Sequence, residues 1–221
     1  MRFSILTVLS IGSIASTLVF SKACPYPSLS EVRRKFYEAA IVPDVLPTFN
    51  PKALLYLVYT GNLSDGSTSK TVLPGISVAR NDTLHPPEIS VTGLKSGPYV
   101  VALIDPDAPS RAKPTFAQVR HLLAGNLTVS TTRSEYVHDS FLLKNSTPAV
   151  NDYLTPTPPA GSGPHRYVAL LYAQPRHFDI SFLNVSDILR FNISSFGDRA
   201  GLGEPLAGTF MTVEVKNTTM V

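Results

Sequence analysis

Two short polar segments carry the side chains of this chain that are best suited to chemistry. The first is DPDAPSR, residues 105–111, which directly follows the apolar run YVVALI at residues 99–104. Proline restricts its own backbone and that of the residue before it, so this turn holds its two carboxylates rigidly at the end of a strand. Arg111 lies four residues beyond Asp107 and is placed to close the turn with a bidentate ion pair. These residues are consistent with an acidic binding site and equally with a rigid turn held by a salt bridge.

The second segment is PPAGSGPHRY, residues 158–167, in which a Pro/Gly-rich loop leads into a strand. His165 and Tyr167 alternate along this strand and therefore point to the same face of the sheet. Glycines allow backbone N–H groups to approach a ligand, while imidazole and phenol groups add hydrogen-bond donors. His121 opens another apolar stretch, HLLAG, and Asp105 is suited to hold an imidazole in one tautomer. A single histidine is more often structural, but the set as a whole predicts a small anion-binding site.

The sequence lacks the common signatures of catalysis. It contains no G-x-S-x-G, H-E-x-x-H, P-loop or G-x-G-x-x-G motif. Its five histidines, at positions 85, 121, 138, 165 and 177, show no ligand spacing within one element, and the only cysteine is Cys24. A zinc site and an internal disulfide scaffold are therefore not expected. An Asp–His pair can act as a general base, but we predict a protein that is not an enzyme and uses no metal or cofactor.

Residues 1–23 have the layout of a secretory signal peptide. Arg2 precedes an uncharged stretch over residues 3–21, and small residues stand at Ser21 and Ala23. Cleavage after Ala23 is expected, which leaves a single domain over residues 24–221 and no transmembrane segment. An uncleaved membrane anchor is the alternative, although the Ser, Thr and Gly residues within the stretch disfavour insertion.

Charge and glycosylation signals agree with secretion. The chain of 221 residues has a formal charge of +3, which falls to +1 when Arg2 and Lys22 are removed with the signal peptide. It has no basic run of five or more residues, so nucleic-acid binding is disfavoured. Seven of the nine asparagines begin an N-x-Ser/Thr sequon, and we expect a secreted glycoprotein, with delivery to a vacuole as the alternative. The predicted glycosylation sites are Asn62, Asn81, Asn126, Asn145, Asn184, Asn192 and Asn217.

Helix and strand patterns place the polar segments in a mainly β domain. Residues 28–31, SLSE, have the form of a capping box, and apolar residues then recur at helical spacing up to Ala40. Ser186 and Asp187 are candidate caps of a second helix that carries Leu189, Ile193 and Phe196 on one face. Short runs rich in β-branched and aromatic residues predict strands at residues 54–59, 99–104, 120–123, 167–172 and 210–215.

In the order and spacing of these segments the chain resembles the phosphatidylethanolamine-binding protein family. The motif DPDAPSR is followed about fifty residues later by G-x-H-R-Y at residues 163–167. Residues 205–209, PLAGT, are similar to the family's C-terminal P-x-A-G-T segment, and the resemblance spans roughly residues 40–215. The family includes the Raf kinase inhibitor protein, plant flowering regulators and fungal carboxypeptidase Y inhibitors.

The resemblance implies a large antiparallel sheet, a smaller second sheet, flanking helices and a small anion pocket. Two prolines and two arginines around the motifs are expected to have structural roles: Pro106, Pro109, Arg111 and Arg166. The residues that match the family's pocket are Asp105, Asp107, His121, Pro159, Gly161, Gly163, His165 and Tyr167.

The sequence also departs from animal members of the family, which place a Trp two residues before the pocket histidine and a second His beside it. Val119 and Arg120 occupy these positions, and Arg120 should point to the face opposite His121. We expect a secreted protein that binds a phospholipid headgroup or a small phosphate-type anion. The alternative is an inhibitor of a serine carboxypeptidase in the secretory or vacuolar pathway, for which the sequence shows no reactive segment.

Overall fold

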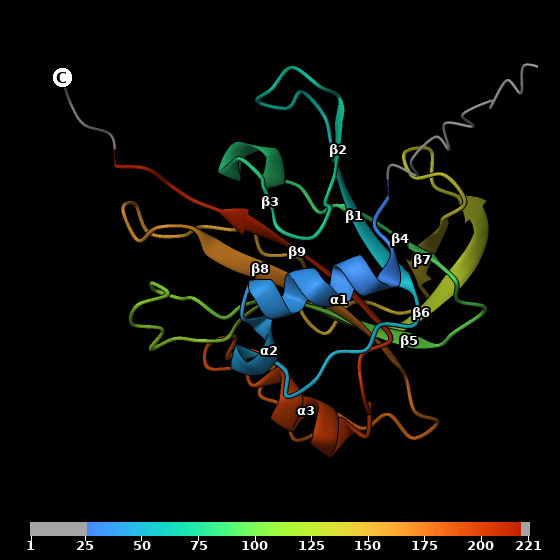
Figure 1. Cartoon of the computed structure of the whole chain (residues 1–221). Coiled ribbons are helices and arrows are strands. Elements are labelled where there is room, and N and C mark those ends of the chain that lie inside the picture. Colours follow the sequence, from blue (N-terminus) through green and yellow to red (C-terminus); the bar gives the residue numbers. More distant parts are fainter. Residues whose placement is uncertain (1–25, 218–221) are drawn as a thin grey trace, which may run out of the picture.

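The computed structural model describes residues 26–217, whose strands form one sheet (Figure 1). Its nine strands lie in the order β2-β1-β4-β7-β6-β5-β8-β9-β3. Neighbouring strands are antiparallel except for the parallel pair β3 and β9. The strands are β1 (Leu54–Thr60), β2 (Ser69–Thr71), β3 (Ile76–Ser77), β4 (Glu88–Thr92), β5 (Tyr99–Asp105), β6 (Val119–Arg133), β7 (Phe141–Asn145), β8 (His165–Ala173) and β9 (Ala207–Val213). The helices are α1 (Leu29–Glu38), α2 (Ile41–Asp44), the 3₁₀-helix η1 (Arg80–Thr83) and α3 (Ile193–Ala200).

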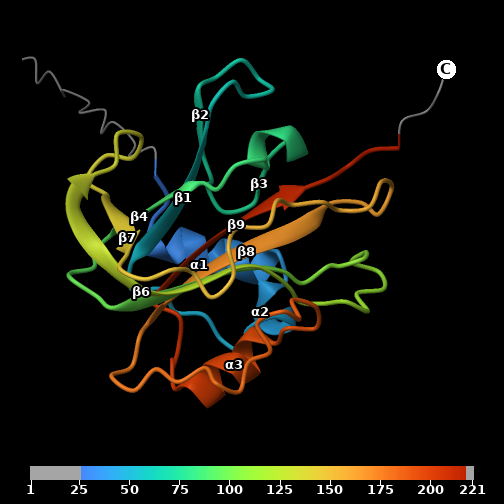
Figure 2. The same ribbon diagram turned by 180° about the vertical axis from the view of Figure 1, so that it is seen from behind.

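The predicted mainly β fold with flanking helices is confirmed. Where the family resemblance implies a large and a smaller sheet, the described strands form one continuous, curled sheet. Figure 1 and Figure 2, seen from opposite sides, place α1, α2 and α3 together on one side of β8 and β9. The opposite face of these strands packs against β1, so the sheet has an apolar layer on each side.

The central strand β5 is buried on both faces because each face meets a different layer. Val100 and Ile104 belong to the apolar cluster under the helices, whereas Val101 and Leu103 belong to the cluster shared with β1 and β9. Successive residues of a strand point to opposite faces, so a strand covered on both sides reads as a continuous apolar run. Asp105 is therefore a carboxylate at the end of a fully buried strand.

Helix α1 begins where the capping box predicts. The Ser28 hydroxyl accepts a hydrogen bond from the backbone N–H of Glu31 at 3.2 Å, and Phe36 on the inner face is fully buried. Gly208 of the PLAGT segment lies directly against this ring, because a Cβ there would come within 2.8 Å of Phe36 Cζ. The absence of a side chain at Gly208 thus allows α1 to pack closely on β9.

The predicted start of the second helix is wrong. Helix α3 is capped by Asn192, whose side chain accepts a hydrogen bond from the backbone N–H of Ser195 at 2.9 Å, and not by Ser186 or Asp187. Arg190 has a φ of +54°, in the left-handed region that an α-helix of L-residues does not include. A helix that starts near Ser186 is therefore interrupted before it reaches the apolar face of α3.

All five predicted strands are confirmed, and four more occur that the sequence did not predict. Strands β2, β3, β4 and β7 are at most five residues long and mostly half-buried, so they lack the dense apolar runs that mark the centre of the sheet. Strand β6 extends to Arg133, well beyond the predicted residues 120–123. The sequence did not indicate this outer part because it is largely exposed and polar and carries no apolar run. Pairing with neighbouring strands, rather than local propensity, forms these short strands.

The predicted signal peptide over residues 1–23 and Cys24 lie outside the described residues. Within residues 26–217 we find no helix with the length and hydrophobicity needed to cross a bilayer.

Candidate functional site

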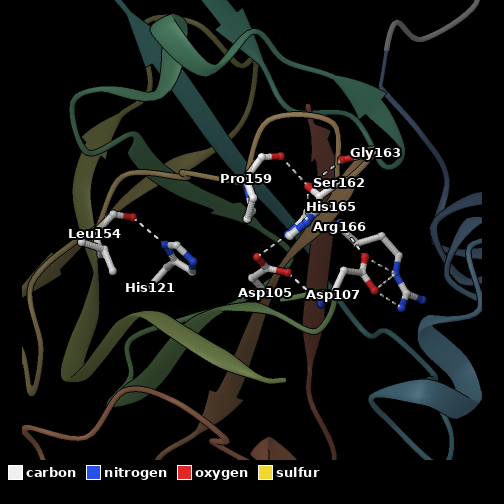
Figure 3. A network of polar contacts seen from close by, with 9 residues as sticks. All are labelled: Asp105, Asp107, His121, Leu154, Pro159, Ser162, Gly163, His165 and Arg166. Carbon is white, nitrogen blue, oxygen red and sulfur yellow. Dashed lines mark hydrogen bonds and ion pairs between the residues drawn. The ribbon is translucent and has the colours of Figure 1, made fainter. Parts of the chain in front are cut away.

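Asp105 and His165 form a buried pair where β5 ends and β8 begins (Figure 3). His165 Nδ1 lies 2.8 Å from Asp105 Oδ2, and the other carboxylate oxygen accepts the backbone N–H of Asp107 at 2.7 Å. Burial lowers the pKa of His165, but the hydrogen bond and charge of Asp105 outweigh it, so the pKa is raised. The carboxylate therefore favours the imidazolium and holds the ring in a fixed orientation.

Ser162, which was not among the predicted site residues, forms a hydrogen bond with the second ring nitrogen of His165. Its Oγ lies 3.0 Å from His165 Nε2 and 2.7 Å from the carbonyl oxygen of Pro159 (Figure 3). The same loop is fastened to the C-terminal segment, because Gly161 N–H donates to the Val215 carbonyl at 3.0 Å. Ser162 thus holds its loop against His165. Its place in a Gly-Ser-Gly turn, three residues before His165, is the sequence signal that could have indicated this role.

A β-bulge in β6 positions His121. Leu103 of β5 pairs with Leu122, but the next residue, Ile104, pairs with Arg120, so His121 is an extra residue in β6. A bulge interrupts the alternation of side chains along a strand. As a result, His121 and Leu122 both lie on the face of the β1-side cluster, and the alternation resumes beyond them.

On this face the ring of His121 meets the ring of Tyr167 edge-on, with centroids 5.0 Å apart and planes inclined by 77°. His121 Nδ1–H donates to the carbonyl of Leu154 at 2.8 Å. Burial raises the pKa of Tyr167, and the nearby Asp105 carboxylate raises it further, so the phenol remains protonated. The structure therefore brings Asp105, His121, His165 and Tyr167, hereafter the imidazole cluster, into one place.

The imidazole cluster is enclosed rather than open. His165 is 0% exposed, Tyr167 1%, and His121 and Asp105 3% each. Burial lowers the pKa of His121, so this ring is neutral near pH 7. Its Nε2 has no hydrogen-bond partner among residues 26–217, which leaves one unpaired nitrogen in the cluster.

Asp107, which the resemblance placed in the same pocket, turns to the other side of the sheet. Its carboxylate accepts hydrogen bonds from Arg166: Nη2 at 2.6 Å, Nε at 2.9 Å and the backbone N–H at 2.8 Å. Because His165 and Arg166 are adjacent in β8, they point to opposite faces, and each meets one of the two aspartates. Arg111, expected to close this turn, instead donates to the Ala39 carbonyl at 3.1 Å and stays exposed.

The predicted Pro/Gly wall forms the loop that carries Ser162. Gly161 and Gly163 have φ values of +75° and +80°, which favour glycine, and a Cβ at Gly161 would lie 2.6 Å from the Asn217 amide. Pro159 contributes its carbonyl to Ser162. Pro106 lines a cavity on the Asp107 side of the turn.

Arg120 takes no part in the imidazole cluster, as expected from its place next to His121. Its guanidinium lies 5.2 Å over the ring of Phe191 on the helix side of the sheet. It donates to the Asn151 side chain at 2.6 Å and to the Val185 carbonyl at 2.8 Å. This arginine therefore fastens two loops to β6.

The hydrogen-bond order Asp105–His165–Ser162 is that of a nucleophilic triad. However, the Ser162 hydroxyl donates to the Pro159 carbonyl at 2.7 Å, and the imidazolium form of His165 that Asp105 favours has no free nitrogen lone pair to accept that proton. The geometry thus fits a serine that holds its loop in place. Among residues 26–217, no three His, Cys, Asp or Glu side chains gather closely enough to hold a metal ion.

Comparison with known proteins supports the resemblance. Residues 62–211 match the family model described as phosphatidylethanolamine-binding protein. The carboxypeptidase Y inhibitor of Saccharomyces cerevisiae is 31% identical over 132 residues, which cover 56% of this chain and 55% of the inhibitor. The chain thus aligns with about half the length of that curated relative.

Two solved structures share the fold. The carboxypeptidase Y inhibitor in complex with its cognate proteinase superposes with a TM-score of 0.70 at 22% identity, covering 85% of this chain and 97% of that chain. A phosphatidylethanolamine-binding protein from Plasmodium vivax superposes with a TM-score of 0.62 at 17% identity, covering 84% and 98%. Since the family model spans most of the chain and the DPD and H-R-Y segments meet within the matched region, this chain belongs to the phosphatidylethanolamine-binding protein family.

Proposed function

We propose that this chain is a secreted binding protein whose imidazole cluster holds a phospholipid headgroup or a small phosphate-type anion. The observation that carries the proposal is His121 Nε2, the nitrogen that no residue within 26–217 pairs with. In Figure 3 the His121 ring is directed toward Asp105, so a ligand on Nε2 would lie between the two segments that carry the family motifs. Membership of a family named for phosphatidylethanolamine binding supports this assignment.

The protonation state of the two imidazoles decides which ligand the cluster accepts. Protonated His165 and ionised Asp105 together carry no net charge, and neutral His121 has Nδ1–H engaged with Leu154. In that state Nε2 of His121 accepts a hydrogen bond, which the P–OH group of a phosphate monoanion supplies. Protonation turns Nε2 into a donor and adds a positive charge, so affinity for phosphate groups should rise as the pH falls toward the pKa of His121, which burial holds below the ordinary histidine value of about 6.5.

We expect a ligand to reach the cluster past the loop of residues 158–164, because Ser162 of this loop lies against His165. Ser162 blocks His165 Nε2, and the loop in turn is held by Val215 and packs against Asn217. A ligand oxygen that replaced the Ser162 hydroxyl would meet the imidazolium of His165. The occupied complex therefore requires that Ser162 moves aside, while the buried Asp105–His165 pair stays in place.

The direct test is the melting temperature of the purified protein at pH 5.5 and pH 7.5 with phosphoethanolamine, a monoester, or glycerophosphoethanolamine, a diester. Binding to the native state raises the melting temperature. We expect a larger rise at pH 5.5, its loss in His121→Ala, and its retention in His177→Ala, a control at an exposed histidine. The diester lacks a P–OH group, so its binding at pH 5.5 alone would favour a lipid headgroup over free phosphate. An unchanged rise in His121→Ala would remove the cluster from the binding site.

A second function is supported by the relatives named as carboxypeptidase Y inhibitors. We propose that the chain also inhibits a serine carboxypeptidase. Adding the protein stepwise to purified carboxypeptidase Y should reduce peptide hydrolysis in proportion to the amount added, and full activity at micromolar protein would reject this target. Equal inhibition by His121→Ala would show that the inhibitory surface is separate from the imidazole cluster.

The surface position of the sequons supports the secretory part of the proposal. Six of the seven sequon asparagines are exposed, and Asn126 is half-buried with its side-chain amide donating to Thr147 Oγ1 at 3.1 Å. We expect a eukaryotic host to release a glycosylated chain that starts at Cys24. N-terminal sequencing of the released protein and its loss of mass on glycosidase treatment test cleavage and glycosylation separately.

A further inference from the structure

A polar cavity of about 530 Å³ lies on the Asp107 side of the DPD turn. Its walls come from the turn itself, from β8 and from the segment before α3. Gln118 and Phe191, which also line the cavity, are joined by backbone pairing, in which Phe191 N–H donates to the Gln118 carbonyl at 2.8 Å. The charged residues that line it are Asp44, Asp107, Arg111, Arg166 and Arg190. None of the four residues of the imidazole cluster is part of this lining, so the cavity is a separate place in the fold.

Among the arginines of this cavity, Arg166 already has hydrogen-bond partners for its Nε, Nη1 and Nη2 atoms. It donates to Asp107 through Nε and Nη2, and its Nη1 donates to Asp44 at 2.9 Å and to the Ala39 carbonyl at 2.8 Å. It therefore compensates the buried carboxylate of Asp107 and part of the charge of Asp44. Because of these contacts, Arg166 and the two carboxylates form a fixed part of the cavity wall, and Arg166 is not free to bind a ligand.

Arg190 and Arg111 carry positive charge that no carboxylate within residues 26–217 pairs with. The side chain of Arg190 has no hydrogen bond or ion pair to any residue within 26–217, and Arg111 gives only one donor, to Ala39. The backbone of Arg190 is held by a hydrogen bond from its N–H to the Phe116 carbonyl at 3.1 Å. Two arginine residues thus line a polar cavity, and the backbone segments that carry them are hydrogen-bonded to one another through Phe116.

We infer that this cavity binds an oxyanion, specifically the dianion of a small phosphate monoester, through Arg111 and Arg190. Three guanidinium groups against two carboxylates leave a net positive lining. Arginine pairs with phosphate oxygens through parallel N–H groups and keeps its charge at every physiological pH. The cavity volume also falls within the range of small-molecule sites, about 300–1,000 Å³. The inference does not depend on the proposed function, since the two sites share no ligand-binding residue.

The test is isothermal titration calorimetry of the purified protein at pH 8 and low salt, with inorganic phosphate and with O-phosphoserine as probes. At this pH His121 is neutral and phosphate is a dianion. The main variant is Arg190→Asn, because asparagine tolerates the left-handed backbone at this position while the guanidinium is removed. Arg111→Gln is the second variant, and Arg176→Gln, at an exposed arginine outside the cavity, is the control.

We expect each cavity variant to weaken binding about tenfold or more, as for the loss of a charged hydrogen bond, while the control binds like the wild type. Tighter binding of O-phosphoserine than of inorganic phosphate supports a monoester ligand, and equal affinity overturns that assignment. Absence of binding to the wild type at millimolar probe overturns the inference. Binding lost in His121→Ala but kept in both arginine variants would assign the anion to the imidazole cluster instead. Failure of headgroup binding at that cluster leaves the expected result here unchanged.

Discussion

Asp105 and Asp107 are two residues apart and both buried, but they serve opposite faces of the sheet and different kinds of cation. Asp105 pairs with the imidazole of His165 beside His121 and Tyr167, whereas Asp107 pairs with the guanidinium of Arg166. The two cations are consecutive residues of β8. The acidic turn thus contacts β8 through both of its aspartates. Because side chains alternate along β8, one contact is with a titratable imidazole and the other, on the opposite face, is with a permanently charged guanidinium.

Loss of Asp105 and loss of Asp107 should therefore have different costs in the free energy of unfolding. An imidazole can release its proton when its partner is lost, so the face of Asp105 can adjust to a change in charge. A guanidinium keeps its charge under all physiological conditions, so the face of Asp107 cannot adjust in this way. Replacing each member of the two pairs in turn measures this difference.

The largest effect is expected for Asp107→Asn. This change removes the buried carboxylate that pairs with Arg166 Nε and Nη2 and leaves only the exposed Asp44, at Nη1, as an anionic partner. Removing one member of a buried ion pair typically costs about 3–5 kcal/mol of the free energy of unfolding. Urea denaturation measures the loss. Asp139→Asn, which removes an exposed ion pair with Arg133, is the control and should cost about 1 kcal/mol or less. A loss of similar size in both variants would contradict the buried role of Asp107.

A smaller effect is expected for Asp105→Asn. We predict a loss of about 1.5–3 kcal/mol, the range for a charge-assisted hydrogen bond, because His165 can become neutral after the change. NMR titration should show that the pKa of His165 falls, since burial then acts without the opposing carboxylate. A pKa of His165 that stays raised in Asp105→Asn would show that another acid, such as Asp107, controls it.

The pH dependence of stability should come from the imidazole face alone. His165 has a raised pKa, so its contribution is complete below about pH 6.5 and is lost as the pH rises through its folded pKa. His121 has a lowered pKa, so its contribution is complete above about pH 6.5 and is lost as the pH falls through its folded pKa. Melting temperatures between pH 5 and pH 8.5 should therefore decline less at high pH in His165→Gln and less at low pH in His121→Gln. The same slopes in both variants as in the wild type would place the titrating groups elsewhere.

Ser162→Ala should separate the stability of the loop from access to the ligand. Loss of the hydroxyl removes the contacts to Pro159 and His165, which should lower the free energy of unfolding by about 0.5–1.5 kcal/mol. The same change frees His165 Nε2, so phosphoethanolamine should bind more tightly at pH 5.5, as measured by calorimetry. Ser110→Ala, in the DPDAPSR turn, serves as the matched control. Weaker binding in Ser162→Ala would mean that the hydroxyl contacts the ligand instead of blocking it.

The smallest effect on stability is expected for Arg111→Ala. Its single hydrogen bond to Ala39 is exposed, and such surface changes usually stay within about 0.5 kcal/mol. Denaturation together with the phosphate titration would show whether this residue acts in binding without acting in folding. A loss comparable to that of Asp107→Asn would mean that Arg111, and not Arg166 alone, stabilises the turn.

Local sequence patterns predicted the central strands, α1 and the mainly β class. Ser28 and Glu31 signal a helix start through contacts between near neighbours, and the apolar run of β5 reflects burial on both faces. The start of α3 could not be predicted in this way, because the left-handed Arg190 is held by a hydrogen bond to Phe116, far away in sequence. The edge strand β3 likewise depends on β9, which follows it by more than a hundred residues.

For the candidate site, residue types and motif spacing selected Asp105, His121, His165 and Tyr167, which the structure places together. Sequence reasoning assigned Asp107 to the same pocket and paired it with Arg111, because a four-residue separation is visible in the sequence while a cross-strand contact is not. The pairing with Arg166 depends on the alignment of β5 with β8, where Ile104 lies opposite Val168. Ser162 was missed for a related reason, since its role depends on how the loop folds back onto His165.

The amino-acid sequence by itself determined which groups can ionise, which strands are wholly apolar and which glycines and prolines shape the loops. These properties belong to single residues or to near neighbours, so they can be read without knowing the fold. Only the tertiary structure decided which cation meets which aspartate, and which imidazole nitrogen and which arginine side chain beside the DPD turn have no partner among residues 26–217. Those outcomes depend on strand register, on the bulge at His121 and on burial, which arise from contacts between segments far apart in the chain.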